Sequence, residues 1–262
     1  MHSFLNFIDR RWRTLAALLV LLLVLMVGVV LWQRFRSPVV PVPAPVRFVC
    51  PLRSDPQPSE TASCRDCMFY PVDKTHRLHA DYAPDLVETG LPGGGLIVPA
   101  ARDALAELFK EAESQGIFPV ITSAYRSYEE QVATFNTWIM SEWQSTLFFT
   151  QALATADRYS ARPGHSEHQL GTTVDLNCRG CVPFDDKSRK NLALWKFLED
   201  NAHRFGFVIS YPRNAENRTG YKYEPWHIRY VGVVYATELY KQGYAAGNDT
   251  CLLALLQNKK RF

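Results

Sequence analysis

The sequence lacks the excess of positive charge that nucleic-acid-binding proteins carry. Its 29 lysines and arginines nearly balance 26 acidic residues, the net charge is +3, and the basic residues form no long block. It also lacks any evident internal repeat. Apolar residues make up 47% and aromatic residues 13% of the 262 residues, which argues against a mostly disordered chain. We therefore expect one globular domain with no nucleic-acid partner, and nothing in the sequence indicates an oligomeric state.

One stretch near the start lacks charge altogether. Residues 14–32 read TLAALLVLLLVLMVGVVLW, with arginines on both sides. Nineteen residues, at about 1.5 Å per residue in a helix, roughly cross a hydrocarbon core about 30 Å thick. The residues that follow, QRFRS, lack a small-residue cleavage site, which favours an uncleaved anchor over a signal peptide. The sequence thus predicts a membrane anchor in residues 1–36, with a transmembrane helix at about 14–32.

A proline-rich stretch comes directly after the predicted anchor. Residues 37–46 read SPVVPVPAPV and contain four prolines. Such a composition favours an extended, semi-rigid polyproline II spacer. We therefore expect a linker over residues 37–59 and the folded domain over residues 60–262.

Six cysteines are present, and two pairs have C-x-x-C spacing. They stand at positions 50, 64, 67, 178, 181 and 251. In a reducing compartment, two such pairs would suggest a four-thiolate zinc site. Outside the membrane, an even number of cysteines favours disulfides. We expect disulfides, and the sequence leaves their pairing open.

Helical and strand patterns are mixed in the predicted domain, without regular βαβ alternation. Ser127 is followed by acidic residues and has the pattern of a helix N-cap, which places Arg126 at the junction of a strand and a helix. The mixture favours an α+β domain with a small, mainly antiparallel sheet and flanking helices. The patterns predict helices at 98–116, 127–143, 150–159, 187–206 and 233–242, and strands at 117–125, 172–177, 206–211 and 226–231.

Histidine and acidic residues are concentrated in two of these segments. GHSEHQLGTTVDLN, residues 164–177, holds His168 and Asp175, and EPWHIRYV, residues 224–231, holds Glu224 and His227. Alternation along the second strand puts His227 and Arg229 on the face opposite the aromatic residues, and a bend at the intervening proline would bring Glu224 to the same pocket. The cluster is consistent with a metal site, an acid–base pair or a polar turn. Two His and one Asp with a position left for water is the pattern of catalytic zinc.

Three blocks of the sequence resemble a known family. SAYRSYEEQ, SEHQLGTTVD and EPWHIRYVG, in this order and at these intervals, are similar to the signature blocks of the VanY-type D-alanyl-D-alanine carboxypeptidases, which are zinc peptidases of bacterial cell-wall metabolism. The similarity runs from about Val98 to Gly243. The resemblance implies an α+β fold, shared with Hedgehog signalling domains, that carries zinc on an antiparallel sheet. The NCRGC motif at 177–181 lies outside the family pattern.

The resemblance also implies a role for each matching residue at the metal. It implies that His168, Asp175 and His227 bind Zn²⁺ and that Glu224 is the catalytic base. Glu224 is placed to take a proton from the water beside the metal.

Further residues are implied at the substrate. Arg126 is expected to hold the substrate and the oxyanion that develops on it, while Gln131 and Ser166 are expected to contact the peptide. His165 lies outside the ligand position of its block, so we interpret it as a substrate-side or surface residue rather than a rival ligand.

The implied function is removal of the C-terminal D-alanine from peptidoglycan stem peptides. The domain would then lie outside the cytoplasmic membrane, held by a single-pass anchor. One alternative is an L,D-carboxypeptidase or an endopeptidase acting on the same stem peptides. Another is a zinc-bearing binding module without catalysis, against which the presence of both Glu224 and Arg126 speaks.

Overall fold

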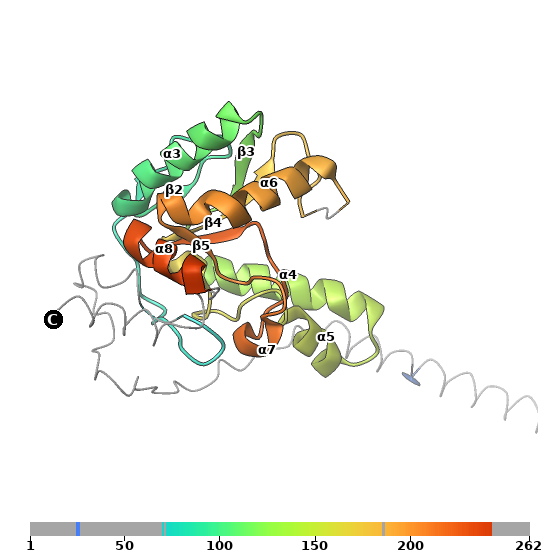
Figure 1. Cartoon of the computed structure of the whole chain (residues 1–262). Coiled ribbons are helices and arrows are strands. Elements are labelled where there is room, and N and C mark those ends of the chain that lie inside the picture. The colour runs from blue at the N-terminus through green and yellow to red at the C-terminus, as the bar shows by residue number, and fades with distance from the viewer. Residues whose placement is uncertain (1–24, 27–69, 71, 185–186, 243–262) are drawn as a thin grey trace, which may run out of the picture. The chain divides into compact units, whose positions relative to one another are not determined.

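The fold is α+β, with a four-stranded antiparallel sheet between helices (Figure 1). A computed structural model describes residues 25–26, 70, 72–184 and 187–242. Its elements are β1 (Val87–Glu88), β2 (Leu96–Ile97), α3 (Pro99–Ser114), β3 (Pro119–Ser123), α4 (Tyr128–Ser145), α5 (Phe149–Ala156), the 3₁₀ helix η1 (Glu167–Leu170), β4 (Thr173–Cys178), α6 (Arg189–Asn201), the 3₁₀ helix η2 (Ala202–Phe205), β5 (Phe207–Ile209), α7 (Glu216–Thr219), β6 (His227–Tyr230) and α8 (Val233–Gln242).

The predicted anchor and linker fall almost wholly outside the described residues. Only residues 25–26 of the predicted span are described. Within the described part of the chain, no helix combines the length and apolar character needed to cross a membrane. The anchor and the domain boundary near residue 60 stay predictions.

The main sheet has the strand order β3-β4-β6-β5, and every neighbouring pair is antiparallel. This confirms the predicted fold class for the described domain. In the register, Asp175 of β4 lies directly opposite His227 of β6, and Ser123 of β3 opposite Asp175. Side chains at directly opposed positions come within about 5 Å of one another. The register thus places Asp175 beside a residue far from it in the sequence.

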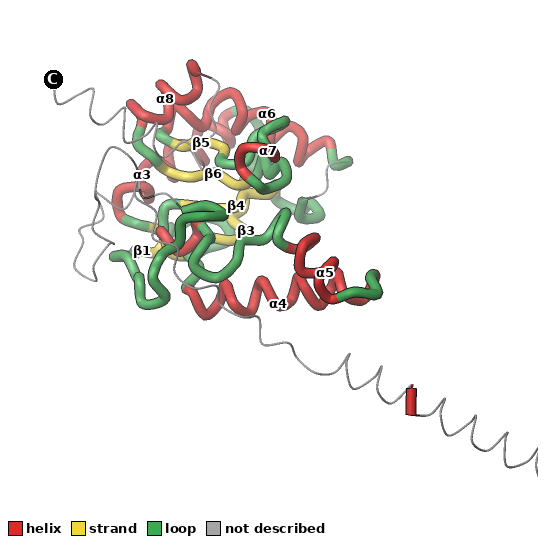
Figure 2. The backbone as a smooth tube through the Cα atoms, turned by 90° about the horizontal axis from the view of Figure 1, so that it is seen from below, coloured by secondary structure: helices red, strands yellow, loops and turns green. Residues whose placement is uncertain are grey.

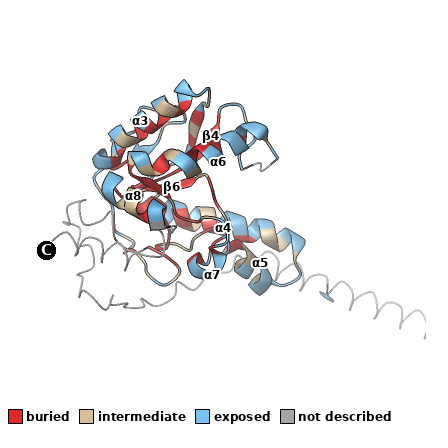
Figure 3. Cartoon of the chain, in the orientation of Figure 1, coloured by how far each residue is buried: buried red, intermediate tan, exposed pale blue. Residues whose placement is uncertain are grey.

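One face of the sheet forms the core. Val174, Leu176 and Ile228 are fully buried and belong to the same apolar cluster as the inward faces of α3 and α6. In Figure 3 the strands and the sheet-facing sides of these helices are buried, while the outer sides are exposed. Figure 1 shows α4 on the side of the sheet away from α3, and Figures 1 and 2 both show α5 packed beside α4. Because successive strand residues alternate between faces, Asp175 and His227 point away from this core.

Local sequence signals account for the main helices. Ser127 caps α4, since its Oγ accepts from the Glu130 N–H while the Glu130 carboxylate accepts from the Ser127 N–H. The predicted helix at 98–116 is α3, with Pro99 at its first position. The predicted helix at 187–206 is α6 followed by η2, and Gly206 ends it in the left-handed conformation. All five predicted helices and four predicted strands are present, with ends that differ by a few residues.

Several short elements were not predicted. The two-residue strands β1 and β2 pair with each other, and α7 spans four residues. Elements this short carry no full period of apolar spacing, so the pattern cannot mark them. The 3₁₀ helix η1 was not predicted either; it begins at Glu167 and carries His168 within it.

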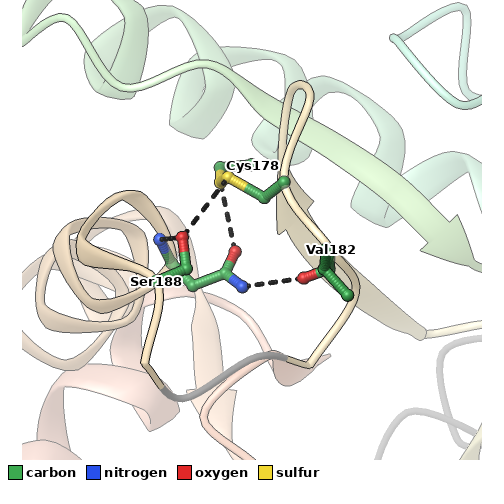
Figure 4. Close-up of a disulfide and its surroundings, with 5 residues drawn as sticks. Cys178, Val182 and Ser188 are labelled. Atoms are coloured by element: carbon green, nitrogen blue, oxygen red, sulfur yellow. Dashed lines mark hydrogen bonds between the residues drawn. A yellow bond between two sulfur atoms is a disulfide. The ribbon is translucent and has the colours of Figure 1, made fainter.

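A disulfide joins Cys178, the last residue of β4, to Cys181 (Figure 4). Asn191 lies beside it, with its Oδ1 3.1 Å from the Cys178 sulfur, while its Nδ2 donates to the Val182 carbonyl. The disulfide agrees with the expected oxidised state of this pair. The other four cysteines lie outside the described residues.

Gly93 marks a close approach between the loop after β1 and strand β3. Its φ is +95°, and a Cβ there would lie 2.0 Å from the Ile121 carbonyl oxygen. The Ile121 N–H donates to the Pro92 carbonyl beside it, so the loop is held against β3. Only a residue without a Cβ fits this contact.

We predict that Gly93→Ala lowers the free energy of unfolding by roughly 3 kcal/mol or more, because left-handed strain adds to a clash with backbone. Gly116→Ala is the matched control, since Gly116 also has a positive φ, but a Cβ there would have none of the described atoms within 4 Å apart from its own chain neighbours. It should lose only the strain, about 1–2 kcal/mol. Urea denaturation measures both variants, and equal losses would contradict the close approach.

Candidate active site

Three metal-binding side chains meet on the face of the sheet opposite the core. His168 comes from η1, Asp175 from β4 and His227 from β6, and one donor atom of each lies within 4.8 Å of the others. The Asp175 carboxylate sits between the imidazoles, with Oδ2 3.1 Å from His168 Nε2 and Oδ1 3.0 Å from His227 Nδ1. All three side chains are buried. The structure therefore brings together the three residues that the sequence marked as zinc ligands.

The hydrogen bond of His168 fixes which of its nitrogens faces Asp175. Its Nδ1 lies 2.7 Å from the Ala124 carbonyl oxygen. A carbonyl only accepts, so Nδ1 carries the hydrogen and Nε2 presents its lone pair to the site.

In His227 the two ring nitrogens have the opposite roles. Its Nε2 lies 3.0 Å from Glu167 Oε2, so Nε2–H donates to that carboxylate and Nδ1 faces Asp175. Burial lowers the pKa of His227, but hydrogen bonds to Asp175 and Glu167 outweigh burial and raise it to about 10. His227 Nδ1 and Asp175 Oδ1 lie within hydrogen-bond distance, and a divalent cation would use the same donor atoms.

Asp175 remains ionised in this buried position. Burial by itself raises the pKa of its carboxyl group, but its interactions with His168 and His227 outweigh burial and lower it. Two imidazole nitrogens and one carboxylate oxygen are a donor set that suits zinc, and three protein ligands leave one coordination position for water or substrate. The residues present therefore fit Zn²⁺ in a catalytic type of site.

Glu224 lies beside the three donors without belonging to them. It precedes the turn at Pro225 that leads into β6, and its Oε2 is 3.9 Å from His227 Nδ1. Burial raises the pKa of Glu224 to about 8, with the charges of His227 and Lys74 acting against this rise. A carboxylate with a pKa near the working pH is suited to accept and return a proton.

Arg126 lies at the junction of β3 and α4, as predicted. Its guanidinium donates through Nη1 to Gln131 Oε1 at 2.8 Å and through Nη2 to Ser123 Oγ at 2.5 Å. Gln131 is buried, and its Nε2 donates to the Ala161 carbonyl at 2.6 Å. The amide of Gln131 is thus engaged on both sides, and it holds Arg126 in place.

Ser166 and His165 precede the first donor. Ser166 Oγ accepts from the His168 N–H at 3.3 Å and so caps η1. His165 is not at the surface, because it is 8% exposed and its Nδ1 lies 2.7 Å from the Asp73 carbonyl oxygen. It is also not one of the three clustered donors.

The partners of His227 on the side away from Asp175 were not predicted from the sequence. Glu167 is fully buried and accepts from His227, from Ser210 Oγ at 2.5 Å and from Arg229 Nη1 at 2.9 Å. Burial raises its pKa, but Arg229, His227 and Ser210 outweigh burial and bring it to about 2. A signal existed, because alternation placed Arg229 on the same face as His227, and a buried arginine needs a carboxylate partner.

The fold and the site define a class. Two imidazoles and a carboxylate on an antiparallel sheet, with a separate carboxyl group beside them, are the arrangement of hydrolases that use a three-ligand zinc site.

Comparison with known proteins identifies the family. A sequence model of the family VanY, D-alanyl-D-alanine carboxypeptidase, matches residues 96–233, which is more than half of the chain. The chain belongs to this family.

Individual relatives agree with the family match. The D-alanyl-D-alanine carboxypeptidase of Enterococcus faecalis (strain ATCC 700802 / V583) is 34% identical over 172 residues, which cover 66% of this chain and 61% of that protein. The chain thus spans about three fifths of that relative's length. Putative carboxypeptidase YodJ of Bacillus subtilis (strain 168) is 36% identical over 132 residues, which cover 50% of this chain and 45% of that protein.

Solved structures share the fold. VanYB in complex with D-alanine-D-alanine has a TM-score of 0.62 and 32% identity, covering 68% of this chain and 94% of that one. A glutamate-to-alanine mutant of the vancomycin resistance D,D-pentapeptidase VanY, in complex with Zn(II), has the same TM-score and identity and covers 69% and 97%. The LdcB LD-carboxypeptidase has a TM-score of 0.57 and 30% identity, covering 68% and 83%.

We predict that the full chain binds one zinc ion that a chelator removes, and that His168→Ala abolishes this binding. His203→Asn is the control, because His203 lies on η2, stacks on Tyr240 and does not belong to the donor group. Metal analysis after dialysis against excess zinc measures the stoichiometry. A His168→Ala protein that keeps the ion as the His203→Asn control does would contradict the assignment.

Proposed function

We propose that this chain is a zinc-dependent carboxypeptidase that removes the C-terminal D-alanine from peptidoglycan stem peptides. The observation that carries the proposal is Glu224, a buried carboxyl group that stands next to the His-Asp-His set and outside it. A site that only binds zinc needs no such group. The sequence match and the relatives' names, which include a D-alanine-D-alanine complex, support the substrate class.

In the proposed hydrolysis, three residues hold zinc and Glu224 transfers the proton. Zinc held by His168, Asp175 and His227 would lower the pKa of a water molecule towards about 7 and polarise the scissile carbonyl group. Glu224 accepts the proton as the water oxygen bonds to the carbonyl carbon. When the C–N bond breaks, Glu224 returns that proton to the leaving amine, so that D-alanine and a shortened peptide result.

Arg126 is proposed to stabilise charge on the substrate. Two of its nitrogens are held by Gln131 and Ser123, so the guanidinium has a fixed orientation. Its other N–H donors are proposed to face the carbonyl oxygen as negative charge develops there, or the terminal carboxylate of the peptide. Ser166, whose hydroxyl caps η1 beside His168, is proposed as a further contact to the peptide.

The proposed location is outside the cytoplasmic membrane, with the domain held by the predicted helix at 14–32. The proposed substrate class is extracytoplasmic, and two observations support the location. Residues 14–32 carry no charge, and a disulfide joins Cys178 to Cys181.

The substrate length decides between this proposal and its nearest alternative. The likeness to an LD-carboxypeptidase makes tetrapeptide hydrolysis the second candidate. The full chain is incubated with pentapeptide and with tetrapeptide stems, and the released amino acid is identified by mass spectrometry. D-alanine from the pentapeptide alone supports the proposal, release from the tetrapeptide alone supports the alternative, and release from neither by a zinc-loaded protein contradicts both.

We predict that Glu224→Gln lowers kcat by about 10²- to 10⁴-fold, the usual contribution of a positioned acid–base group, while zinc content stays at one per chain. The amide keeps the volume of the side chain but cannot accept the proton. Glu216→Gln is the control, since Glu216 is exposed on α7 and pairs with Arg158. Turnover by Glu224→Gln at the level of that control would remove Glu224 from the mechanism.

A further inference from the structure

A segment that precedes the family-matched residues lies directly against η1, the 3₁₀ helix that carries His168. We define it as Tyr70 together with residues 72–82 and call it the N-terminal segment. Its first contact is apolar, because Val72, Leu78 and Tyr82 form a buried cluster with Leu170, the last residue of η1. The family match begins only at residue 96.

Polar contacts attach the same segment on both sides of His168. The Leu78 N–H donates to the Gly164 carbonyl at 2.8 Å, and His165 Nδ1 donates to the Asp73 carbonyl at 2.7 Å. On the other side, Gln169 Nε2 donates to the His79 carbonyl at 2.9 Å and lies 3.3 Å from the Tyr82 carbonyl.

The segment is also connected to His227 through two buried charged residues, Arg229 and Glu167. Arg229 donates through Nη2 to the Tyr70 carbonyl at 2.9 Å and through Nη1 to Glu167 at 2.9 Å. Glu167 in turn accepts from His227 Nε2. Arg229 and Glu167 are both fully buried, so bulk water does not reach either side chain. The orientation of His227 therefore depends on a series of contacts that ends at the backbone of the N-terminal segment.

We propose that the N-terminal segment is a positioning element of the zinc site, which sets metal affinity by holding η1 and, through Arg229 and Glu167, the imidazole of His227. The inference rests on the zinc site of the proposed function and extends it to residues outside the family match. Outer partners of metal-binding histidines typically change affinity by about 10- to 100-fold when they are lost. None of the segment's residues needs to touch the metal for this effect.

Two leucines provide a matched test in the full chain. Leu78 and Leu239 are each buried in a separate small apolar cluster, and only the cluster of Leu78 includes η1. Truncating either leucine to alanine leaves a comparable cavity. Zinc affinity is measured by competition with a chromophoric chelator at a temperature where denaturation curves show both variants to be folded. We expect Leu78→Ala to weaken zinc binding about 10-fold or more and Leu239→Ala to leave it within about two-fold.

A second variant tests the charged contacts without a cavity. Arg229→Lys keeps the positive charge, but a single ammonium group cannot reach both Glu167 and the Tyr70 carbonyl as the guanidinium does. Its zinc affinity should fall by about 10- to 100-fold, with Arg204→Lys, at an exposed arginine, as the control. Nitrogen-15 NMR of the imidazoles should show His227 protonated on Nε2 in the zinc-loaded parent and a mixture of tautomers in Arg229→Lys.

The zinc-binding measurements distinguish a failure of the positioning role from a failure of the proposed function. A parent protein that binds no zinc would overturn the proposed function itself. A parent that binds zinc, with Leu78→Ala and Arg229→Lys binding it as tightly as their controls, would overturn only the positioning role of the N-terminal segment.

Discussion

The buried carboxylate of Asp175 is the constraint on which the rest of the site depends. A charge removed from water needs compensating partners, and here Oδ1 faces His227 Nδ1 and Oδ2 faces His168 Nε2, the two nitrogens that would share a cation with it. The imidazoles are fixed on their far sides by the Ala124 carbonyl and by Glu167. Rotating any one of these groups would leave another without its partner. The donor set is therefore ordered by the protein before a cation arrives.

The sheet sets the positions of Asp175 and His227, and contacts from outside the sheet set the orientation of the imidazoles. Pairing of β4 with β6 brings Asp175 opposite His227, while the other face of the same strands buries Val174 and Ile228 in the core. Hydrogen bonds from outside the sheet then select the nitrogen that each histidine offers. The stability of the core and the geometry of the site thus rest on the same strand pair.

Local signals in the sequence were enough to predict the main helices and strands and the elements on which several site residues lie. The cap at Ser127, the amphipathic helices and strand alternation depend on residues near one another in the chain, and they placed Arg126 and His227 correctly on their elements. The strand order β3-β4-β6-β5 and the contacts of Glu167 and Tyr70 join residues far apart in the sequence. Periodicity carries no information about such pairings, so only the convergence of the three metal donors was anticipated, from the resemblance of the three blocks.

Along β6, residues of the site and residues of the core alternate one by one. His227 and Arg229 face the metal-binding side, and Ile228 and Tyr230 face the apolar side. A slip of a single residue against β4 would turn the imidazole and the guanidinium into the core and expose the apolar pair to the site. A chain with β6 out of register consequently cannot gather the three metal donors. In an aged or refolded sample, the amount of bound zinc would report the fraction of molecules with the native strand register.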